Sequence, residues 1–280
     1  MLEELAKTKK DEYLNYTEPL YDLIDETYNY TSIEQLESKF DNVDIIRKTF
    51  IYEYLFGATD NFLMTGNNYN FYQKSNGKWD YIPVDFNSVF FVNLKRLLAT
   101  LPFHIPKLED LIGYTTYSFE EWHAPGVRKP FIDILYSQDK EGFVEELKEL
   151  LITCFNPDEL LPRIDELHEF IVPYIERDTT PDENGNLPGR INLKGITVPY
   201  TIEESKRNVN FDNDNDGNIG LKRFIEAKFD AVCKLYGINK NEILRKAKIY
   251  RSRRALEIKI YNLKQIIFEL QTKFNEMFKK

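Results

Sequence analysis

The chain contains two kinds of hydrophobic pattern. Between residues 69 and 84, two short β-prone runs flank Asn76-Gly77, a pair that favours a tight turn between antiparallel strands. Elsewhere apolar residues recur mainly at spacings of three and four, which is typical of amphipathic helices. The pattern predicts a predominantly helical α+β fold with one small hairpin. We expect helices over 2–15, 33–55, 131–135 leading into 141–154, 158–177 (starting at Asn156-Pro157) and 220–236 (ending at Gly237), and irregular chain over 86–126 and 178–218.

The end of the chain has its own repeat. Apolar residues alternate there at spacings of four and three, the heptad pattern of a long amphipathic helix, at Leu256, Ile260, Leu263, Ile267, Leu270, Phe274 and Met277. We therefore divide the chain into a domain over 1–239 and a basic amphipathic helix over 240–280. The apolar stripe must be buried, either against the same chain or in a dimer through 256–277.

The turn sets the register of the predicted hairpin. In a two-residue type I′ turn at Asn76-Gly77, Ser75 faces Lys78. Counting outward, Asn68 then falls opposite Asp85 at the open end of the hairpin. Directly opposed residues have Cβ atoms about 4.5–5.5 Å apart, close enough for their oxygens to bind one hard cation.

These polar residues allow a chemical and a structural interpretation. Asp60 precedes the hairpin and enters the same open end, so Asp60, Asn68 and Asp85 form a candidate site. A register shift of one residue would exchange which side chains point inward, so Asn67, Asn70 and Asn87 are second-choice ligands for a metal or a phosphate. The alternative is that Asp and Asn serve here as ordinary turn and capping residues.

Three stretches around this site resemble the spore coat protein H (CotH) kinase family. They are residues 50–61, ending in Asp60-Asn61, residues 67–72, and residues 77–87, which contain Gly77-Lys-Trp79 and Ile82-Pro-Val-Asp85. The resemblance continues through residues 128–135, 163–167, 173–178 and 220–226, and covers roughly residues 15–238. It implies an atypical protein-kinase fold, of which this chain would supply the C-terminal lobe.

The resemblance also implies a reaction. A CotH-type kinase transfers the γ-phosphoryl group of ATP to a Ser or Thr hydroxyl of a coat, surface or extracellular protein. It implies that Asp60 orients or deprotonates the hydroxyl, and that Asp85 and Asn68 bind Mg²⁺ or Mn²⁺. The alternative is a kinase-derived binding module that holds a protein partner in a surface or extracellular enzyme assembly without turnover.

The chain departs from the family pattern in two places. The family's Trp-Asp-x-Asp is Val84-Asp85-Phe86-Asn87 here, so one acidic residue is an amide. The family's nucleotide lobe carries a glycine-containing cover and a phosphate-binding Lys, whereas the 59 residues before Asp60 form a helical pattern without a glycine-rich loop. Activity is therefore expected only if that lobe is supplied elsewhere.

A second acidic motif suggests a weak calcium loop over 212–223. Asp212, Asp214 and Asp216 occupy positions 1, 3 and 5 of an EF-hand-like loop, followed by a glycine at position 6. Position 12, normally a bidentate Glu, is Arg223. The alternatives are weak Ca²⁺ binding, as in a calcium-stabilised binding module, and a solvated acidic turn.

The charge distribution and the hydropathy of the chain limit its possible functions and locations. Residues 240–280 contain 12 Lys and Arg against 4 Asp and Glu, a balance of +8, whereas residues 1–239 contain 25 basic and 42 acidic residues, a balance of −17. The acidic body argues against nucleic-acid binding. The sequence contains neither a signal-peptide pattern nor an apolar run long enough to span a membrane. The family resemblance nevertheless implies an extracellular, cell-surface or spore-surface location.

Overall fold

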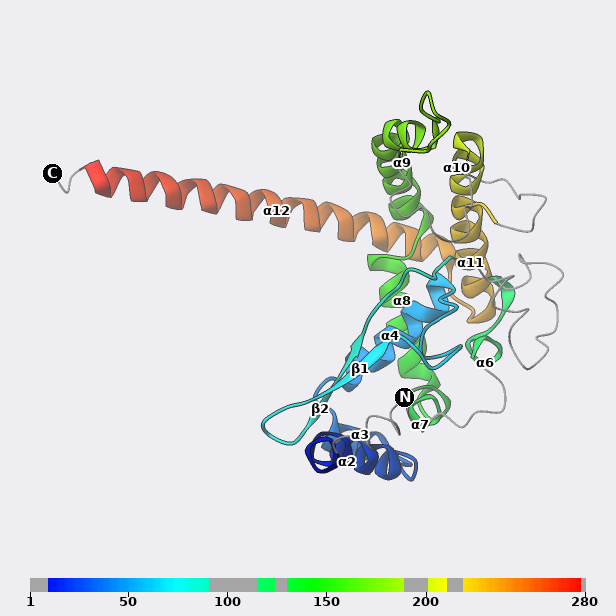
Figure 1. Cartoon of the computed structure of the whole chain (residues 1–280). Helices are drawn as coiled ribbons and strands as arrows, with labels where there is room; N and C mark the ends of the chain where they lie inside the picture. Colours follow the sequence, from blue (N-terminus) through cyan, green and yellow to red (C-terminus); the bar gives the residue numbers. More distant parts are fainter. Residues whose placement is uncertain (1–9, 91–114, 124–129, 189–200, 211–218, 278–280) are drawn as a thin grey trace. The chain divides into compact units, whose positions relative to one another are not determined.

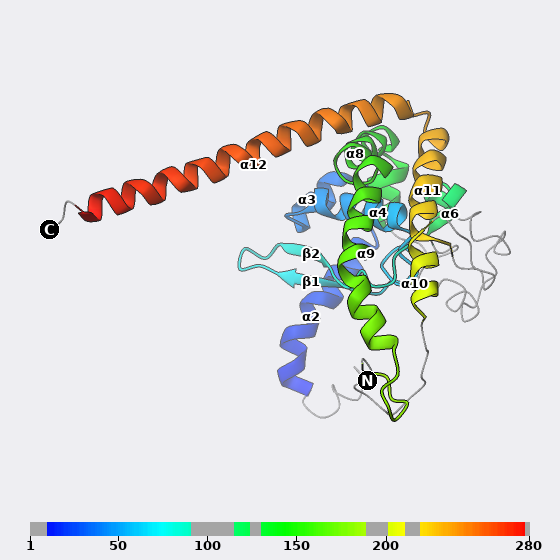
Figure 2. The ribbon, with the colours of Figure 1, turned by 90° about the horizontal axis from the view of Figure 1, so that it is seen from above.

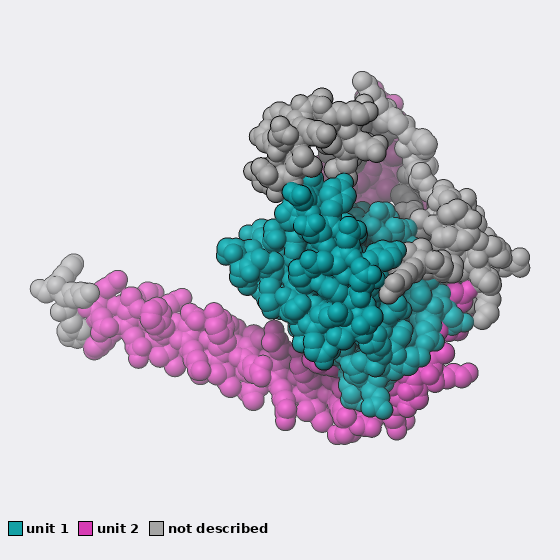
Figure 3. All heavy atoms as spheres, turned by 90° about the horizontal axis from the view of Figure 1, so that it is seen from below, with its two compact units in different colours: residues 1–100, 119–147 teal, residues 101–118, 148–280 magenta. Residues whose placement is uncertain are grey.

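The computed structural model describes residues 10–90, 115–123, 130–188, 201–210 and 219–277. These residues fold into helices and one two-stranded antiparallel sheet, which confirms a predominantly helical α+β fold (Figure 1). The chain divides into two compact units, residues 1–100 with 119–147, and residues 101–118 with 148–280 (Figure 3). Among the described helices, none combines the length and apolar character needed to cross a bilayer.

The first unit contains the hairpin and the helices that precede it. Its elements are α2 (Lys10–Thr27), α3 (Ile33–Lys39), α4 (Val43–Phe56), β1 (Tyr69–Gln73), β2 (Trp79–Pro83), α6 (Phe119–Trp122), α7 (Pro130–Ile132), a π-helical turn (Asp133–Ser137) and most of α8 (Lys140–Thr153). Aromatic rings hold this unit together: Phe62 stacks on Phe50 of α4 at 5.3 Å, and Tyr69 stacks on Tyr81 across the hairpin at 5.6 Å. Phe62 lies two residues after Asp60 and Tyr69 directly follows Asn68, so the core fixes the backbone of the candidate site.

The second unit contains α9 (Pro157–Thr179), α10 (Ile202–Val209), α11 (Leu221–Leu235) and α12 (Lys240–Met277), seen from a second direction in Figure 2. Asn156 caps α9 by accepting the amide N–H of Glu159, with Pro157 in the first turn, as the sequence predicts. The predicted stop at Gly237 is also confirmed, because this glycine has the left-handed φ of 62° that ends helices. Arg251 of α12 pairs with Glu159 of α9 at 3.3 Å.

Three predicted elements were wrong. The first helix does not end near Asn15 but continues to Thr27. The helix expected over 33–55 is broken at residues 40–42, because these residues bond to the hairpin instead: the N–H of Asp41 donates to the carbonyl of Trp79 at 3.1 Å. The segments expected to be irregular contain two helices: α6 lies within 86–126, and α10 lies within 178–218 and begins with a capping box between Thr201 and Glu204.

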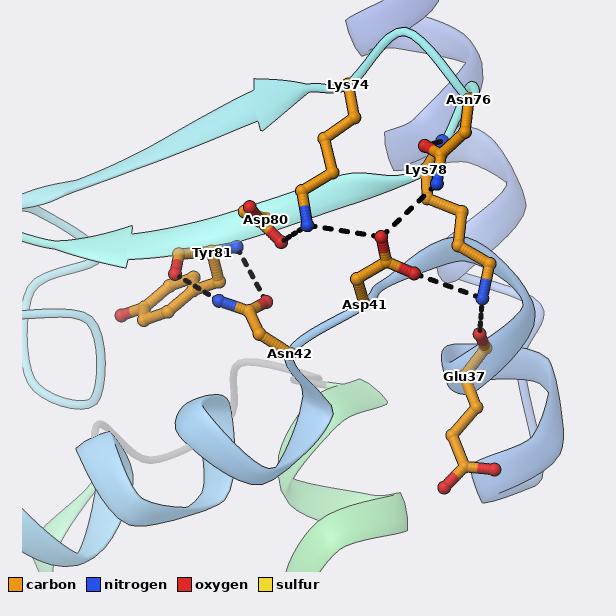
Figure 4. A network of polar contacts seen from close by, with 8 residues as sticks. All are labelled: Glu37, Asp41, Asn42, Lys74, Asn76, Lys78, Asp80 and Tyr81. Atoms are coloured by element: carbon orange, nitrogen blue, oxygen red, sulfur yellow. Dashed lines mark hydrogen bonds and ion pairs between the residues drawn. The ribbon is translucent and has the colours of Figure 1, made fainter.

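Asn42 and Asp41 anchor the hairpin to the start of α4 (Figure 4). The Asn42 side chain brackets the Tyr81 backbone: it donates to the carbonyl at 2.9 Å and accepts the N–H at 3.0 Å, as a neighbouring strand would. At the turn, Asp41 accepts from Lys74 at 3.1 Å and pairs with Lys78 at 3.2 Å, and Lys74 also pairs with Asp80 at 2.9 Å. The exposed edge of β2 is thereby covered, and the hairpin has a defined position beside α4.

Candidate active site

The loop that carries Asp60 begins where α4 ends. Gly57 terminates the helix with a left-handed φ of 59°, and the N–H of Ala58 bonds back to the Glu53 carbonyl at 2.8 Å. The Glu53 carboxylate, which is buried, accepts the amide N–H of Leu63 at 2.8 Å. A buried carboxyl group on the helix therefore holds the middle of the loop, and the loop places Asp60 at the open end of the hairpin.

The Asp60 carboxylate lies within a set of hydrogen-bond donors. Its Oδ1 accepts from Asn67 at 2.9 Å and from Thr65 at 3.1 Å. Asn68 donates to the Asp60 carbonyl at 2.6 Å and lies 3.5 Å from Oδ2. These donors fix the direction of a half-buried carboxylate that still faces solvent on one side. Because the side-chain nitrogen of Asn68 faces Asp60, the side-chain oxygen of Asn68 is left to accept a hydrogen bond or to bind a cation.

Asp85 lies in the segment that leaves β2. Asn68 and Asp85 both have left-handed backbones, with φ of 58° and 50°, a conformation that Asn and Asp adopt more readily than most residues. The Asp85 side chain is exposed, and its Oδ1 accepts the N–H of Asn87 at 3.2 Å. Two adjoining chain segments thus turn sharply at the residues that carry the candidate ligands.

Asn61 joins the Asp60 loop to the Asp85 segment. Its fully buried side chain donates to the carbonyl oxygens of Val84 at 3.3 Å and Asp85 at 3.4 Å. Thr59 adds a second link, because its N–H and its hydroxyl both donate to the Ser88 carbonyl, at 2.9 and 3.1 Å. The two residues that flank Asp60 therefore join its loop to the Asp85 segment, and sequence reasoning missed this role of Asn61 and Thr59.

The register of the hairpin differs by one residue from the prediction. Tyr69 pairs with Pro83, and Lys74 closes the turn by bonding to Lys78 at 2.8 Å, so Asn68 faces Val84 and not Asp85. The cause is a three-residue loop, Ser75-Asn76-Gly77, in which Gly77 has a left-handed φ of 82°. This loop contains one residue more than the predicted two-residue turn, so the pairing of the two strands shifts by one residue. The predicted direct opposition of Asn68 and Asp85 was therefore wrong.

The second-choice ligands divide into two groups. Asn67 contacts Asp60, and Asn87 contacts Asp85 through its N–H, while its side-chain oxygen accepts from Ser88 at 2.9 Å. Asn70 lies within β1, exposed and paired with Ile82. The calcium-loop residues Asp212, Asp214 and Asp216 lie outside the described residues.

The donor set suits a magnesium ion that also binds phosphate. Mg²⁺ prefers oxygen ligands and is usually held by one or two carboxylates together with waters and substrate phosphates. Asp85 supplies one carboxylate and Asn68 an amide oxygen. Among the described residues, no cluster of three or more His, Cys, Asp and Glu could hold a metal alone. A divalent ion here would therefore take its remaining ligands from water and nucleotide.

Comparison with known proteins identifies relatives of the chain. The chain is 28% identical to Invasin CotH2 of Rhizopus delemar over 217 residues, which are 74% of this chain and 33% of the relative. It is also 28% identical to Invasin CotH3 of the same organism over 214 residues, 75% of this chain and 33% of the relative. The chain thus spans about one third of the length of these relatives. No solved structure matches the chain.

A family profile matches a similar share of the sequence. The profile of the CotH kinase protein family matches residues 2–210, which include the loop of Asp60, both strands and Asp85. The match covers well over half of the chain. On this basis, the chain belongs to the CotH kinase protein family, whose members have a kinase-like fold.

Proposed function

We propose that this chain carries the phosphoryl-transfer site of a CotH-type protein kinase. The supporting observation is the link made by Asn61, which holds the loop of Asp60 against the segment of Asp85, while Asn68 contacts Asp60. The order Asp, Asn, hairpin, Asp is the order of catalytic and metal-binding residues in protein kinases. The substrate would be a Ser or Thr hydroxyl of a protein.

Asp60 would act on the hydroxyl group that attacks the γ-phosphorus of ATP. Its carboxylate is directed by Asn67 and Thr65 and retains a solvent-facing side. The hydroxyl oxygen would form a bond to phosphorus as the bond to the β-phosphate oxygen breaks, with ADP as the leaving group. The hydroxyl proton would pass to Asp60. Phosphoryl transfer depends mainly on such positioning and on charge stabilisation.

Asp85 and Asn68 would bind the nucleotide through a divalent metal. A bound Mg²⁺ or Mn²⁺ would neutralise charge on the phosphates during transfer. The Asp85 carboxylate has one oxygen engaged by the N–H of Asn87, which leaves the second oxygen for the cation. The exposure of Asp85 is consistent with a ligand that arrives from solvent.

Calorimetry of ATP binding tests the metal site. The chain should bind ATP only when Mg²⁺ or Mn²⁺ is present, and Asp85→Asn should weaken binding at least tenfold. Asp44→Asn removes the same charge from an exposed residue of α4 and should have no effect. Asp60→Asn should retain ATP binding within about threefold and, where a nucleotide lobe is supplied, should lose transfer of labelled phosphate to protein. Metal-dependent binding that Asp85→Asn leaves intact would disprove the assignment.

The second candidate is a kinase-derived binding module. The lysines of the hairpin, Lys74 and Lys78, are engaged with Asp41 at the turn, so they are not available as the phosphate-binding lysine. A nucleotide would then require a lysine from another part of the protein. If the chain binds no ATP with either metal, the binding module becomes the preferred function. Binding of Ca²⁺ at 212–223 would fit that function and can be measured by titration with the metal alone.

The names of the relatives support a proposal for the location of this chain. Both curated relatives are invasins, a name that describes proteins acting at a cell surface. We propose an extracellular or surface location for this chain and a protein as its substrate or assembly partner. Fractionation of the source cells followed by immunodetection tests this location, and recovery only from the cell interior would contradict it.

A further inference from the structure

The C-terminal helix exposes a long apolar stripe. α12 comprises 38 residues and is drawn as one continuous helix in Figures 1 and 2. Six apolar side chains of its heptad repeat are between 45% and 60% exposed: Leu256, Ile260, Leu263, Ile267, Leu270 and Phe274. Helices gain most of their stability by packing an apolar face, so a stripe of this length is expected to have a partner.

The spacing of the stripe specifies what kind of partner fits. Reading the repeat as abcdefg places Ile260, Ile267 and Phe274 at a, and Leu256, Leu263 and Leu270 at d. A strict period of 3.5 residues keeps a seam aligned along another helix, whereas a straight helix on a globular surface follows 3.6. Ile at a with Leu at d is the combination that favours two parallel strands.

We propose that α12 pairs in register with α12 of a second copy of this chain, forming a parallel two-stranded coiled coil over residues 256–277. In that arrangement each a side chain meets its own copy, and so does each d side chain. From Leu256 to Met277 every a and d position is apolar, and Arg253 at the preceding a position ends the seam. This proposal is independent of the phosphoryl-transfer site.

The area available agrees with a stable dimer. Burying roughly 100 Å² of each of the six exposed side chains on both helices would remove about 1,200 Å² from water, the lower end of the range for specific interfaces. A shallow hollow on α12, lined by Leu270, Gln271, Phe274 and Asn275, gives the seam a depression that can receive a side chain of the partner.

Like charges beside the seam oppose the parallel orientation less than the antiparallel one. In parallel strands a g residue faces the e residue of the next heptad of the partner, which brings Lys259 close to Lys264 of the other copy. In antiparallel strands g faces g and e faces e. Lys259 would then meet Lys273, and Lys264 would meet its own copy, so more like charges would oppose each other.

The oligomeric state of the full chain is the first test. We expect light scattering after size exclusion to give twice the 33.2 kDa mass of the chain. Ile260→Lys places a charge in the seam and should weaken dimerisation at least tenfold. Ile258→Lys is the matched control, because it changes the same residue type on the opposite face of the helix and should leave the dimer intact. A monomer at all concentrations, a larger assembly, or equal effects of the two variants would overturn the proposal.

A single introduced cysteine tests the orientation. In the parallel dimer Leu263→Cys places two thiols opposite each other at d, within the Cα separation of about 4.4–6.8 Å that disulfides need. Mild oxidation should convert the variant to a covalent dimer. Neither Cys154 nor Cys233 forms a disulfide, so the unaltered chain is the control for the contribution of the native thiols. A non-covalent dimer in which Leu263→Cys fails to cross-link would rule out the parallel register.

Discussion

The side-chain amide of Asn61 donates a hydrogen bond to the main-chain carbonyl of Asp85 at 3.4 Å, although the two residues are 24 positions apart in the sequence. The same amide reaches the Val84 carbonyl at 3.3 Å, so one fully buried side chain holds the segment that turns at Asp85. Since Asn61 follows Asp60 directly, any movement of this side chain would shift both aspartates. Asn61 is therefore a positioning residue for the proposed site.

Replacing Asn61 with Ala should lower both stability and nucleotide affinity. The variant leaves the carbonyls of Val84 and Asp85 without this donor, and such a loss costs about 1–3 kcal/mol of unfolding free energy. The left-handed backbone of Asp85 would lose its restraint, so metal-dependent ATP binding should weaken more than the stability change predicts. Urea unfolding and calorimetry on the same sample measure the two effects.

The matched control for this variant is Asn29→Ala. Asn29 also donates its side-chain amide to a main-chain carbonyl, that of Asp25 at 3.0 Å, but it is exposed at the end of α2. Its removal should change the unfolding free energy by less than about 0.5 kcal/mol, as is usual for surface positions. Equal effects of the two variants would contradict the positioning role of Asn61.

Glu53 provides a second test of how the Asp60 loop is held. Its buried carboxylate accepts the N–H of Leu63 at 2.8 Å. Glu53→Ala should cost about 1–3 kcal/mol, because the Leu63 N–H would be buried without this acceptor. Glu53→Gln keeps an acceptor at the same distance and should lose less, as measured by urea unfolding. A Gln variant as unstable as the Ala variant would show that the negative charge, and not the hydrogen bond, is required.

Local signals in the sequence predicted the helix ends but not the contacts that cross the fold. Asn156-Pro157 and Gly237 act within one turn of their own helices, so their roles can be inferred from neighbours alone. Phe40 and Asn42 end and restart a helix because they bond to β2, some forty residues later. Sequence periodicity contains no information about such a partner.

The candidate site, too, could be predicted only in part from the sequence. The order of Asp60, Asn68 and Asp85 could be read from the sequence, and so could the hairpin between them. The register could not, because Asn76-Gly77 fits both a two-residue turn and the last two positions of a three-residue loop. The link through Asn61 was not predicted, because the sequence alone does not distinguish a buried Asn from an exposed Asn in a turn.

The turn of the hairpin should loosen in acid. The hydrogen bond from Lys74 is the main cause of the lowered pKa of Asp41, and bonds from Asn76 and Lys78 add to it. A carboxyl group whose pKa is lowered by folding stabilises the fold at pH values above its unfolded pKa of about 4, and this stabilisation is lost as the pH falls through the folded pKa.

Lys74 responds at the opposite end of the pH range. Its pKa is raised, chiefly because of Asp80, so the stability that it contributes is fully present below its unfolded pKa of about 10.4 and is lost as the pH rises through the folded pKa.

Amide exchange measures this loosening. The protection factors of the Lys74 and Gly77 N–H groups, which close the turn, should fall once the pH drops below about 4. Asp41→Asn removes the titrating group, so its turn amides should already exchange faster at neutral pH and show no further acid step. An acid step of the same size in this variant would assign the effect to another group.

Gly77 tests the observed turn against the predicted one. Its φ of 82° strains any residue with a Cβ, although an added Cβ would meet no atom within 4 Å. Gly77→Ala should therefore cost about 1 kcal/mol through backbone strain alone. Gly185→Ala is the control, because that glycine has a φ of 79° in equally open space and should leave exchange in the hairpin unchanged.

The same variant series distinguishes the two registers. A type I′ turn needs positive φ at both Asn76 and Gly77, whereas among the described residues the left-handed non-glycine positions are Asn68, Asp85 and Phe90. Asn76→Ala should therefore add no backbone strain and lose only the side-chain bonds to Asp41 and to the Lys78 N–H. Nuclear Overhauser contacts should join Phe71 to Tyr81 across the strands. Contacts from Phe71 to Ile82 as its direct partner would restore the two-residue turn, and with it the opposition of Asn68 and Asp85.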